Sequence, residues 1–472
     1  MGRRFTFPAA FVLLLAAPAL ATSPGSLVLT HVSVIDATGA TAQPDMTVEV
    51  RDHRIALVAA SAKVRIPRDA LVVDAAGKFL IPGLWDMHVH TGPRDVYLPL
   101  YVANGVTGVR DMGGDLEEPT GYGSARYVQL RLWREAIEQA SLLGPRMVLA
   151  GFLIDGIAWP GNVVATNPDE GRRAVDVLER LGVDFVKVKS LLARDTYVAI
   201  AAEARRRRIA LAGHVPGSVR VADASDAGQK SIEHLTGIAL GCSADETQLM
   251  EEMAAAFATR DRERYARAEA RATETLDATR AAALFARFVR NDTWQVPTLV
   301  ELRANAFGAP GDGSPMDETC WKYLPASLRE RWKREATAGA TDAGRRAFAG
   351  ELAMVRRMHV AGVSFLAGTD SANPFVPPGF SLHEELKLLV AAGLSPMETL
   401  QAATRNPARY LGRERELGTI EVGKLADLVL LDSDPLADIA STRRIAAVIV
   451  NGRYLGRADL DAMLARVEAS VR

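Results

Sequence analysis

The sequence predicts an α/β protein: a (β/α)8 TIM barrel with a small β-sandwich domain formed from both chain ends. Three observations predict this fold. Short apolar runs alternate with helical stretches through the middle of the chain, and β-branched runs separated by turn residues occupy both ends. The chain has 472 residues, more than one ordinary domain, and a barrel of about 250 residues with a smaller partner accounts for that length.

Residues 1–21 are expected to be a signal peptide. Arginines precede an apolar run over residues 8–20, and Ala19 and Ala21 supply the small residues that a signal peptidase reads. The run is shorter than the ~20 residues that span a bilayer, which favours cleavage after Ala21 over a retained anchor. We therefore expect a periplasmic or secreted protein with no stable membrane anchor after cleavage.

The β-sandwich is expected over residues 22–79 and 413–472. In the first part, short β-branched runs such as residues 46–50 are separated by turn residues. Short β-branched runs separated by turn residues occur again after residue 413. Within this part, Asn451 and Gly452 are a typical hairpin turn sequence. Two β-rich ends flanking a long middle indicate one domain assembled from both termini.

The metal-dependent barrel is expected over residues 80–412. Its eight candidate strands end near His90, Asp111, Ala150, Lys189, Val215, His234, Leu299 and Asp370. Active sites in this fold gather at the carboxyl ends of the strands. Two connections, near residues 244–290 and 301–350, are too long for plain loops and are expected to be helical insertions. They are either a lid over the pocket or solvated decoration.

Composition and charge exclude some classes of partner. Apolar residues make up 48% and charged residues 24% of the chain, and the net charge is -1, which gives no reason to expect nucleic acid or an anionic membrane as partner. Cys242 and Cys320 lack metal-ligand spacing. Their spacing leaves open one disulfide in an oxidising compartment, and a homo-oligomer is left open as well.

Titratable side chains gather where the barrel would place an active site. His88 and His90 end the first strand, and residues i and i+2 of a strand point to the same face, so one metal ion could accept a nitrogen from each. The further groups at strand ends are Lys187 or Lys189, His214, His234 and Asp370. Neutral imidazoles and carboxylates suit zinc or similar divalent ions. A buried lysine is costly as a cation, but its neutral amine can react with carbon dioxide to give a carbamate, which behaves as a bridging carboxylate.

These motifs resemble the amidohydrolase superfamily, close to its imidazolonepropionase-like and prolidase-like branch. The matching pieces are residues 81–90, 105–111, the strand ending at 187, 231–234, 366–370, 400–408 and 423–429, so the resemblance covers essentially the whole mature chain. The resemblance implies two divalent metal ions, most simply Zn2+. His88 and His90 would bind the first ion, and His214 and His234 the second. On the motif match, the carbamate of Lys187 would bridge the two ions.

The implied chemistry is hydrolysis. Two cations lower the pKa of a bridging water to near 7 and polarise the scissile carbonyl. Asp370, which would also contact the first ion, takes the proton of the water and delivers it to the leaving nitrogen. Relatives often carry a histidine or tyrosine where this chain has Pro216, so either the second metal or Tyr197 would polarise the carbonyl. Trp159 and Pro160, after the third strand, are candidates for the pocket lining.

Further residues are candidate substrate contacts. Arg110 ends the second strand and could pair with a substrate carboxylate or with a neighbouring acid. His383 lies in a loop that opens a helix and is a pocket candidate. Lys189 is expected at the pocket rim, where it could meet a substrate carboxylate. Glu233 is expected to face the helix layer of the barrel, and Tyr197 either functions in the pocket or packs in the core.

The expected function is therefore cleavage of an amide (C–N) bond in a small substrate. A dipeptide or an N-acyl amino acid is the first choice, since the resembled branch contains prolidase-like dipeptidases and carboxamidases. A cyclic amide, as in imidazolonepropionase, is the second choice within hydrolases. The alternatives are a non-catalytic periplasmic metal- or solute-binding protein, which would not need Asp370 as a base, and a lyase or isomerase on the same scaffold.

Overall fold

The computed structural model describes residues 25–113, 127–158, 161–259, 261–308, 318–335 and 341–472. The expected signal peptide and the pocket candidates Trp159 and Pro160 lie outside these residues. In the described part of the chain, every helix is too short or too polar to cross a membrane.

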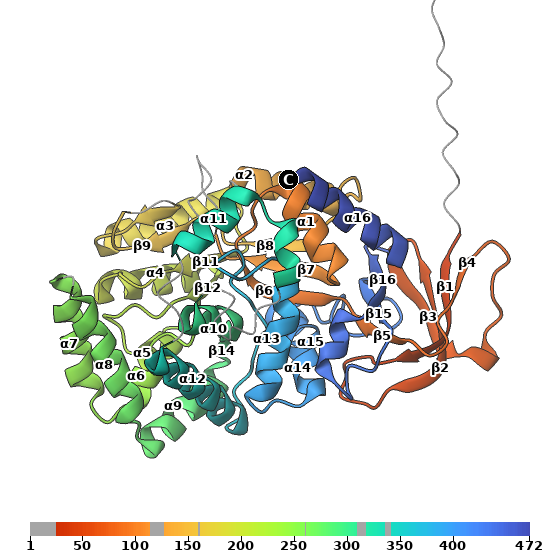
Figure 1. Cartoon of the computed structure of the whole chain (residues 1–472). Helices are drawn as coiled ribbons and strands as arrows, with labels where there is room; N and C mark the ends of the chain where they lie inside the picture. Colours follow the sequence, from red (N-terminus) through yellow and green to blue (C-terminus); the bar gives the residue numbers. More distant parts are fainter. Residues whose placement is uncertain (1–24, 114–126, 159–160, 260, 309–317, 336–340) are drawn as a thin grey trace, which may run out of the picture.

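Strands from both ends of the chain share one sheet, at the right of Figure 1. Its strands are β1 (Leu27–Val34), β2 (Gln43–Arg51), β3 (Arg54–Ala60), β4 (Leu71–Asp74), β5 (Phe79–Pro82), β15 (Leu428–Leu431), β16 (Ile445–Val450) and β17 (Arg453–Gly456). They run in the order β17-β16-β15-β5-β1-β2-β3, with β4 beside β1. The antiparallel pairing of β5 with β15 joins the two ends of the chain. A sandwich of two facing layers stays a prediction, because the hydrogen bonds define a single sheet.

The middle of the chain forms short parallel strands. One group contains β6 (Leu84–Val89), β7 (Val106–Asp111) and β8 (Arg146–Leu149), and the other contains β9 (Leu153–Asp155), β10 (Asn162–Val164), β11 (Phe185–Val188), β12 (Ala210–Gly213), β13 (Gln229–Glu233) and β14 (Trp294–Val296). All pairings within these groups are parallel. Most of these strands are buried on both sides, as expected for apolar strands covered by helices.

The segment before Asp370, where the eighth strand is predicted to end, forms no regular strand, but isolated parallel bridges at Phe365 and Ser371 place it between β14 and β6. Leu366 donates its N–H to the carbonyl of Gln295 (2.9 Å), and Met87 donates its N–H to the carbonyl of Ala367 (2.8 Å). Because this segment runs parallel to its neighbours, its carboxyl end lies on the same side as the carboxyl ends of the other strands. A segment that links β14 to β6 is consistent with a barrel.

The ends of the first seven predicted strands agree with the observed ones to within a few residues, and the largest difference is at the seventh strand. The seventh strand, β14, ends at Val296, whereas the sequence predicts that it ends near Leu299. Thr298 adopts a left-handed conformation with φ 49° and begins the next helix instead. The helix therefore starts directly at the carboxyl end of the strand.

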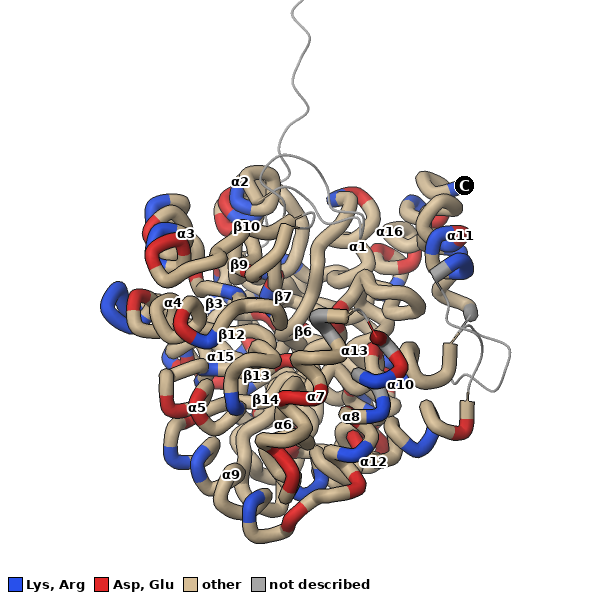
Figure 2. The backbone as a smooth tube through the Cα atoms, turned by 90° about the vertical axis from the view of Figure 1, so that its left-hand side faces the viewer, with Lys and Arg blue, Asp and Glu red and all other residues tan. Residues whose placement is uncertain are grey.

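Helices surround the parallel strands (Figure 1). They are α1 (Arg94–Ala103), α2 (Tyr127–Glu138), α3 (Pro168–Leu181), α4 (Arg194–Arg207), α5 (Val221–Asp226), α6 (Ile238–Cys242), α13 (Phe380–Ala391), α14 (Pro396–Ala402), α15 (Arg405–Tyr410) and α16 (Arg457–Ser470), with 3-10 turns at Ser61–Lys63 and Ile439–Arg443. Helix α3 shows how the local sequence sets the ends of a helix. The side chain of Asn167 caps its first turn, and Gly182 ends it with φ 75°. Figure 2 shows positive and negative residues interspersed over the outer helices, as the small net charge predicts.

Both predicted insertions are helical. The first contains α7 (Glu246–Ala258), α8 (Arg262–Glu274) and α9 (Ala278–Asn291), and the second contains α10 (Leu299–Phe307), a 3-10 turn (Glu318–Tyr323), α11 (Ala326–Glu335) and α12 (Asp342–Val360). Helix α10 packs against α12 and α13. Cys242 ends α6, Cys320 lies in the 3-10 turn, and no disulfide joins these two described residues.

Candidate metal centre

Four histidines and one aspartate meet at the carboxyl ends of the parallel strands. The ring centres of His88 and His234 lie 4.6 Å apart, those of His214 and His234 4.9 Å, and those of His88 and His90 5.7 Å. Asp370 lies among them: its Oδ1 is 3.2 Å from Nε2 of His90 and 3.3 Å from Nε2 of His88, and its Oδ2 is 3.6 Å from Nε2 of His234. The structure therefore brings these five sequence-predicted residues into one cluster.

Lys187 joins this cluster from strand β11. Its side chain is 1% exposed, and its Nζ lies 3.4 Å from Nε2 of His88. Burial lowers the pKa of Lys187 to about 7, against the opposing effect of Glu233 and Asp370. A neutral amine, the form that reacts with carbon dioxide, is therefore accessible near neutral pH. Lys189 lies just beyond the end of β11, and burial lowers its pKa as well.

Unusual backbone conformations aim two of these side chains. His234 has φ 57° and Asp370 has φ 61°, in the left-handed region that few residues other than glycine adopt. Hydrogen bonds from the backbone hold both residues. His234 donates its N–H to the carbonyl of Val296 (3.0 Å), and Asp370 donates its N–H to the carbonyl of His88 (2.7 Å). Such conformations recur at functional sites, where the surrounding structure enforces them.

Three of the four imidazoles share one arrangement, in which Nδ1 meets an oxygen of a neighbouring side chain. The pairs are His88 with Glu233 (2.8 Å), His214 with Ser190 (2.7 Å) and His234 with Thr298 (2.7 Å). Such partners fix the orientation and tautomer of metal-binding histidines. An ionised Glu233 can only accept, so His88 donates from Nδ1 and its Nε2 carries a lone pair.

This lone pair gives a test of whether a cation fits. Nε2 of His88 faces Oδ1 of Asp370, and no described residue donates a hydrogen bond to that buried oxygen. Two acceptors at 3.3 Å repel one another unless a cation lies between them. Burial lowers the pKa of His88 and His214 well below the usual value, and it lowers the pKa of His234 to about 4. These three imidazoles are therefore neutral, the form that binds metal, and the residues fit a divalent ion.

Arg110 has the structural role, the alternative that the sequence left open. It is fully buried, and its Nη2 contacts both carboxylate oxygens of Glu233 at 2.9 and 3.0 Å. Its Nε donates to the carbonyl of Met87 (2.6 Å), and its Nη1 donates to the hydroxyls of Ser231 and Tyr410 (2.9 Å each). Every N–H direction is used inside the protein, so we do not retain Arg110 as a substrate contact.

The expectation that Glu233 faces the helix layer is wrong. Ser231 and Glu233 lie two apart on β13, and both side chains point inward to Arg110. The strand ends at Glu233, and the positive φ of His234 turns the chain there. The alternation of side chains between the two faces of the strand therefore holds for Ser231 and Glu233 but breaks at His234, which also points to the cluster.

Tyr197 and His383 lie in the core. Tyr197, on α4, is fully buried and donates its hydroxyl to the side-chain oxygen of Gln229 (2.8 Å). His383, on α13, is fully buried between the hydroxyl of Thr442 (3.0 Å) and the carbonyl of Asn104 (3.1 Å). Both polar ends are used by neighbours outside the cluster, so neither is retained as a pocket residue.

Glu301 is a site residue that the sequence reasoning missed. It lies on the first turn of α10, and its carboxylate, the imidazole of His234 and the carboxylate of Asp370 offer ligand atoms within 4.8 Å of one another. Burial, with a further contribution from Asp370, raises the pKa of Glu301 to about 8. The available signal was its position directly after the seventh strand, where barrel proteins place functional groups.

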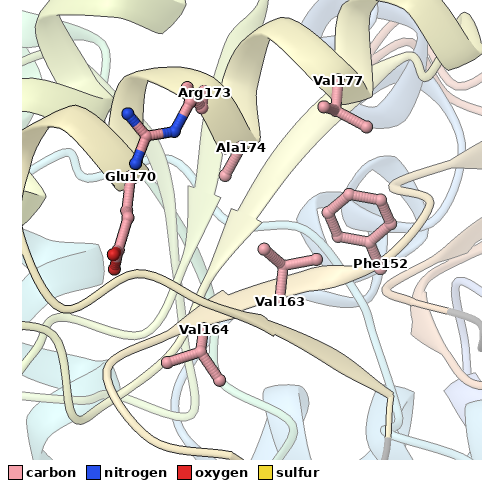
Figure 3. A pocket seen from close by; sticks show the side chains of 7 residues that line it. All are labelled: Phe152, Val163, Val164, Glu170, Arg173, Ala174 and Val177. Atoms are coloured by element: carbon pink, nitrogen blue, oxygen red, sulfur yellow. The ribbon is translucent and has the colours of Figure 1, made fainter.

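A separate surface groove lies between α3 and the strands β9 and β10 (Figure 3). It is lined mainly by apolar side chains, among them Phe152, Val163 and Val177. Its charged residues are Glu170 and Arg173, and Glu170 accepts hydrogen bonds from the N–H and hydroxyl of Thr166. None of the clustered metal-ligand candidates lines the groove, so it is distinct from the metal centre.

Comparisons with known proteins agree with this site. Ochratoxinase from Aspergillus niger is 25% identical over 415 residues, which cover 76% of this chain and 71% of that protein. Imidazolonepropionase from Pseudomonas aeruginosa is 26% identical over 383 residues, which cover 78% of this chain and 82% of that protein.

Solved structures share the fold. A protein described as a prolidase from Bifidobacterium longum aligns with a TM-score of 0.67 at 25% identity, covering 94% of this chain and 99% of its own. Bottromycin amidohydrolase aligns with a TM-score of 0.70 at 24% identity, covering 95% and 91%. The sequence profile of the amidohydrolase family matches residues 79–455, which confirms the resemblance seen in the motifs. The chain therefore belongs to the amidohydrolase family and is an enzyme that hydrolyses carbon–nitrogen bonds.

Proposed function

We propose that this amidohydrolase cleaves the amide bond of a dipeptide or an N-acyl amino acid, using two divalent ions, most simply Zn2+, at the end of a closed (β/α)8 barrel. The supporting observation is the contact of two acceptors, Nε2 of His88 and the buried Oδ1 of Asp370 at 3.3 Å. A strand-end cluster of neutral imidazoles around a carboxylate is the donor set that such ions prefer.

The ligands divide into two groups. His88 and His90 would hold one ion, and His214 and His234 the other. Lys187 lies against His88, and a carbamate on its amine would add the oxygens that bridge both ions. This assignment gives a role to a lysine that is 1% exposed.

The chain's own residues would handle the proton. The bound ions would supply a water acidic enough to react at neutral pH and would polarise the scissile carbonyl. Asp370 would take the proton of the attacking water and deliver it to the leaving nitrogen. Asn373 donates its side-chain N–H to Oδ2 of Asp370 (2.6 Å), which holds the carboxylate in place while Oδ1 faces the reaction.

Lys189 supports a substrate with a carboxylate. It is a largely buried cation next to the cluster, and Asp370 and Glu301 both stabilise its charge. A carboxylate of an amino-acid substrate would complement this ammonium group. The prolidase among the similar structures supports a dipeptide, and the cyclic amide of imidazolonepropionase is the second candidate.

A substrate panel tests this function. Metal-loaded enzyme is incubated with dipeptides, N-acyl amino acids and cyclic amides, and release of the amine is measured for each. We expect turnover of the linear amides that carry a carboxylate. Turnover confined to cyclic amides would replace the proposal with the imidazolonepropionase-like alternative, and binding without turnover of any amide would favour a solute-binding protein.

We also propose export, on the basis of the apolar run over residues 8–20 and the small residues before position 22. The mature protein should begin at Thr22. Amino-terminal sequencing of protein from the extracytoplasmic fraction checks this, and a mature protein that begins at Met1 would favour a membrane anchor.

A further inference from the structure

Glu301 lies beside the proposed metal centre, but the proposed mechanism assigns it no role. Helix α10 begins immediately after β14, and Thr298, its N-cap residue, contacts Nδ1 of His234. Glu301 follows three residues later, on the same turn of the helix, and its N–H donates to the carbonyl of Thr298 (2.9 Å). One helical turn thus orients a candidate metal ligand and presents a carboxylate beside it.

The helix that carries Glu301 is fixed in place. Val300 donates its N–H to a carboxylate oxygen of Glu385 on α13 (2.8 Å), and Arg303 forms an ion pair with Glu384 (3.4 Å). The side chain of Asn305 donates a hydrogen bond to Oε1 of Glu301. A carboxylate held in this way does not need a large rearrangement to contact a ligand.

The electrostatic environment of Glu301 favours a bound cation. Asp370, whose carboxyl group keeps a low pKa, acts on it with a charge of its own sign. Lys189 is a cation that also interacts with it, and Lys189 interacts with Asp370 as well. A second positive group between Glu301 and Asp370 would relieve the repulsion between the two carboxylates.

We propose that Glu301 binds the free α-ammonium group of the substrate, so that the enzyme is a dipeptidase that discriminates against N-acyl amino acids. This inference rests on the proposed function and chooses between its two substrate classes. Bond lengths place an α-nitrogen about 2.5 Å from the carbonyl carbon of its own residue, and a charge-assisted hydrogen bond adds about 2.8 Å. The Glu301 carboxylate would then lie within about 5 Å of the scissile carbon, and its ligand atom lies within 4.8 Å of those of His234 and Asp370, the proposed base.

The test uses substrates that differ by the amine alone. N-propionyl-L-phenylalanine is L-alanyl-L-phenylalanine with the ammonium group replaced by hydrogen, and the same pair can be made for other second residues. kcat/KM is measured for both members with the metal-loaded wild type and with Glu301→Gln, which keeps the size of the side chain and an acceptor for Asn305. Glu330→Gln is the matched control, because Glu330 is about 60% exposed on α11 and pairs with Lys333.

We expect Glu301→Gln to lower kcat/KM for the dipeptide by 10- to 100-fold, the effect of losing a hydrogen bond between charged groups. The value for the propionyl compound should change by less than 3-fold, the metal content should stay that of the wild type, and Glu330→Gln should resemble the wild type. An equal loss for both compounds, or no loss for either, would overturn the role of Glu301 alone. Loss of a metal ion in Glu301→Gln would make the residue a ligand and overturn it too. A wild type that turns over neither compound of any pair would overturn the proposed function together with this inference.

Discussion

Replacing Glu233 with glutamine should destabilise the protein more than any change of one surface charge. Glu233 is fully buried and accepts hydrogen bonds from three side chains. The donors are Arg110 (2.9 and 3.0 Å), Ser231 (2.6 Å) and His88 (2.8 Å). Glutamine keeps the shape of the side chain but removes the negative charge and turns one acceptor into a donor. Arg110 would then be a fully buried cation without a counter-charge.

The size of the effect follows from the burial. Breaking a buried ion pair by removing one partner costs about 3–5 kcal/mol, since the remaining charge is left uncompensated. His88 also loses the acceptor for its Nδ1–H, and changes of this kind lower metal affinity by roughly 10- to 100-fold. The free energy of unfolding is measured by urea titration of metal-free protein, and the metal affinity is measured by competition with a chelator.

A double-mutant cycle isolates the cause. Arg110→Met removes the charge that Glu233→Gln leaves unpaired, so the double variant should recover a large part of the loss. Glu330→Gln, at a largely exposed ion pair, should leave the unfolding midpoint unchanged. A loss below about 1 kcal/mol in Glu233→Gln, or a double variant that loses the sum of the two single changes, would refute the buried-pair argument.

Further predictions concern the cluster itself. Lys187→Ala should lose metal and activity, and short carboxylic acids should partly restore both, whereas rescue of Lys189→Ala instead would reverse the assignment of the bridging lysine. Asp370→Asn should lower kcat far more than it changes KM, because the proton is transferred in the transition state; near-normal kcat would remove Asp370 as the base. In metal-free protein without carbon dioxide, Lys187 has a lowered pKa of about 7 against 10.5 in the unfolded chain, so between these values the unfolded chain binds one more proton. The free energy of unfolding should therefore rise with pH by about 1.4 kcal/mol per unit relative to Lys187→Met between pH 7 and 10.5, and parallel curves for the two proteins would contradict this.

The sequence predicted much of the fold because the signals were local and repeated. Each parallel strand is a short apolar run that ends close to a polar residue, and the carboxyl ends of parallel strands converge. Residues far apart in the chain, such as His88 and Asp370, could therefore be placed together before any contact was known. The insertions could be recognised as helical from their periodicity and length.

The remaining features depend on contacts that no local pattern encodes. Arg110 and Glu233 form a pair across 123 positions of sequence, and a polar residue in an apolar strand can equally bind a substrate. The left-handed conformation of His234 breaks the alternation from which the direction of Glu233 was predicted. Glu301 belongs to the site because the seventh strand stops at Val296 and a helix begins there, a boundary that sequence patterns locate only to within a few residues.

Anomalous diffraction from crystals of zinc-loaded enzyme tests the metal centre most directly. The proposal predicts two anomalous peaks about 3.5–4 Å apart, one beside His88 and His90 and the other beside His214 and His234, with continuous density from the amine of Lys187 between them. A single peak, or two peaks with an unmodified Lys187 amine, would contradict the carbamate-bridged binuclear centre.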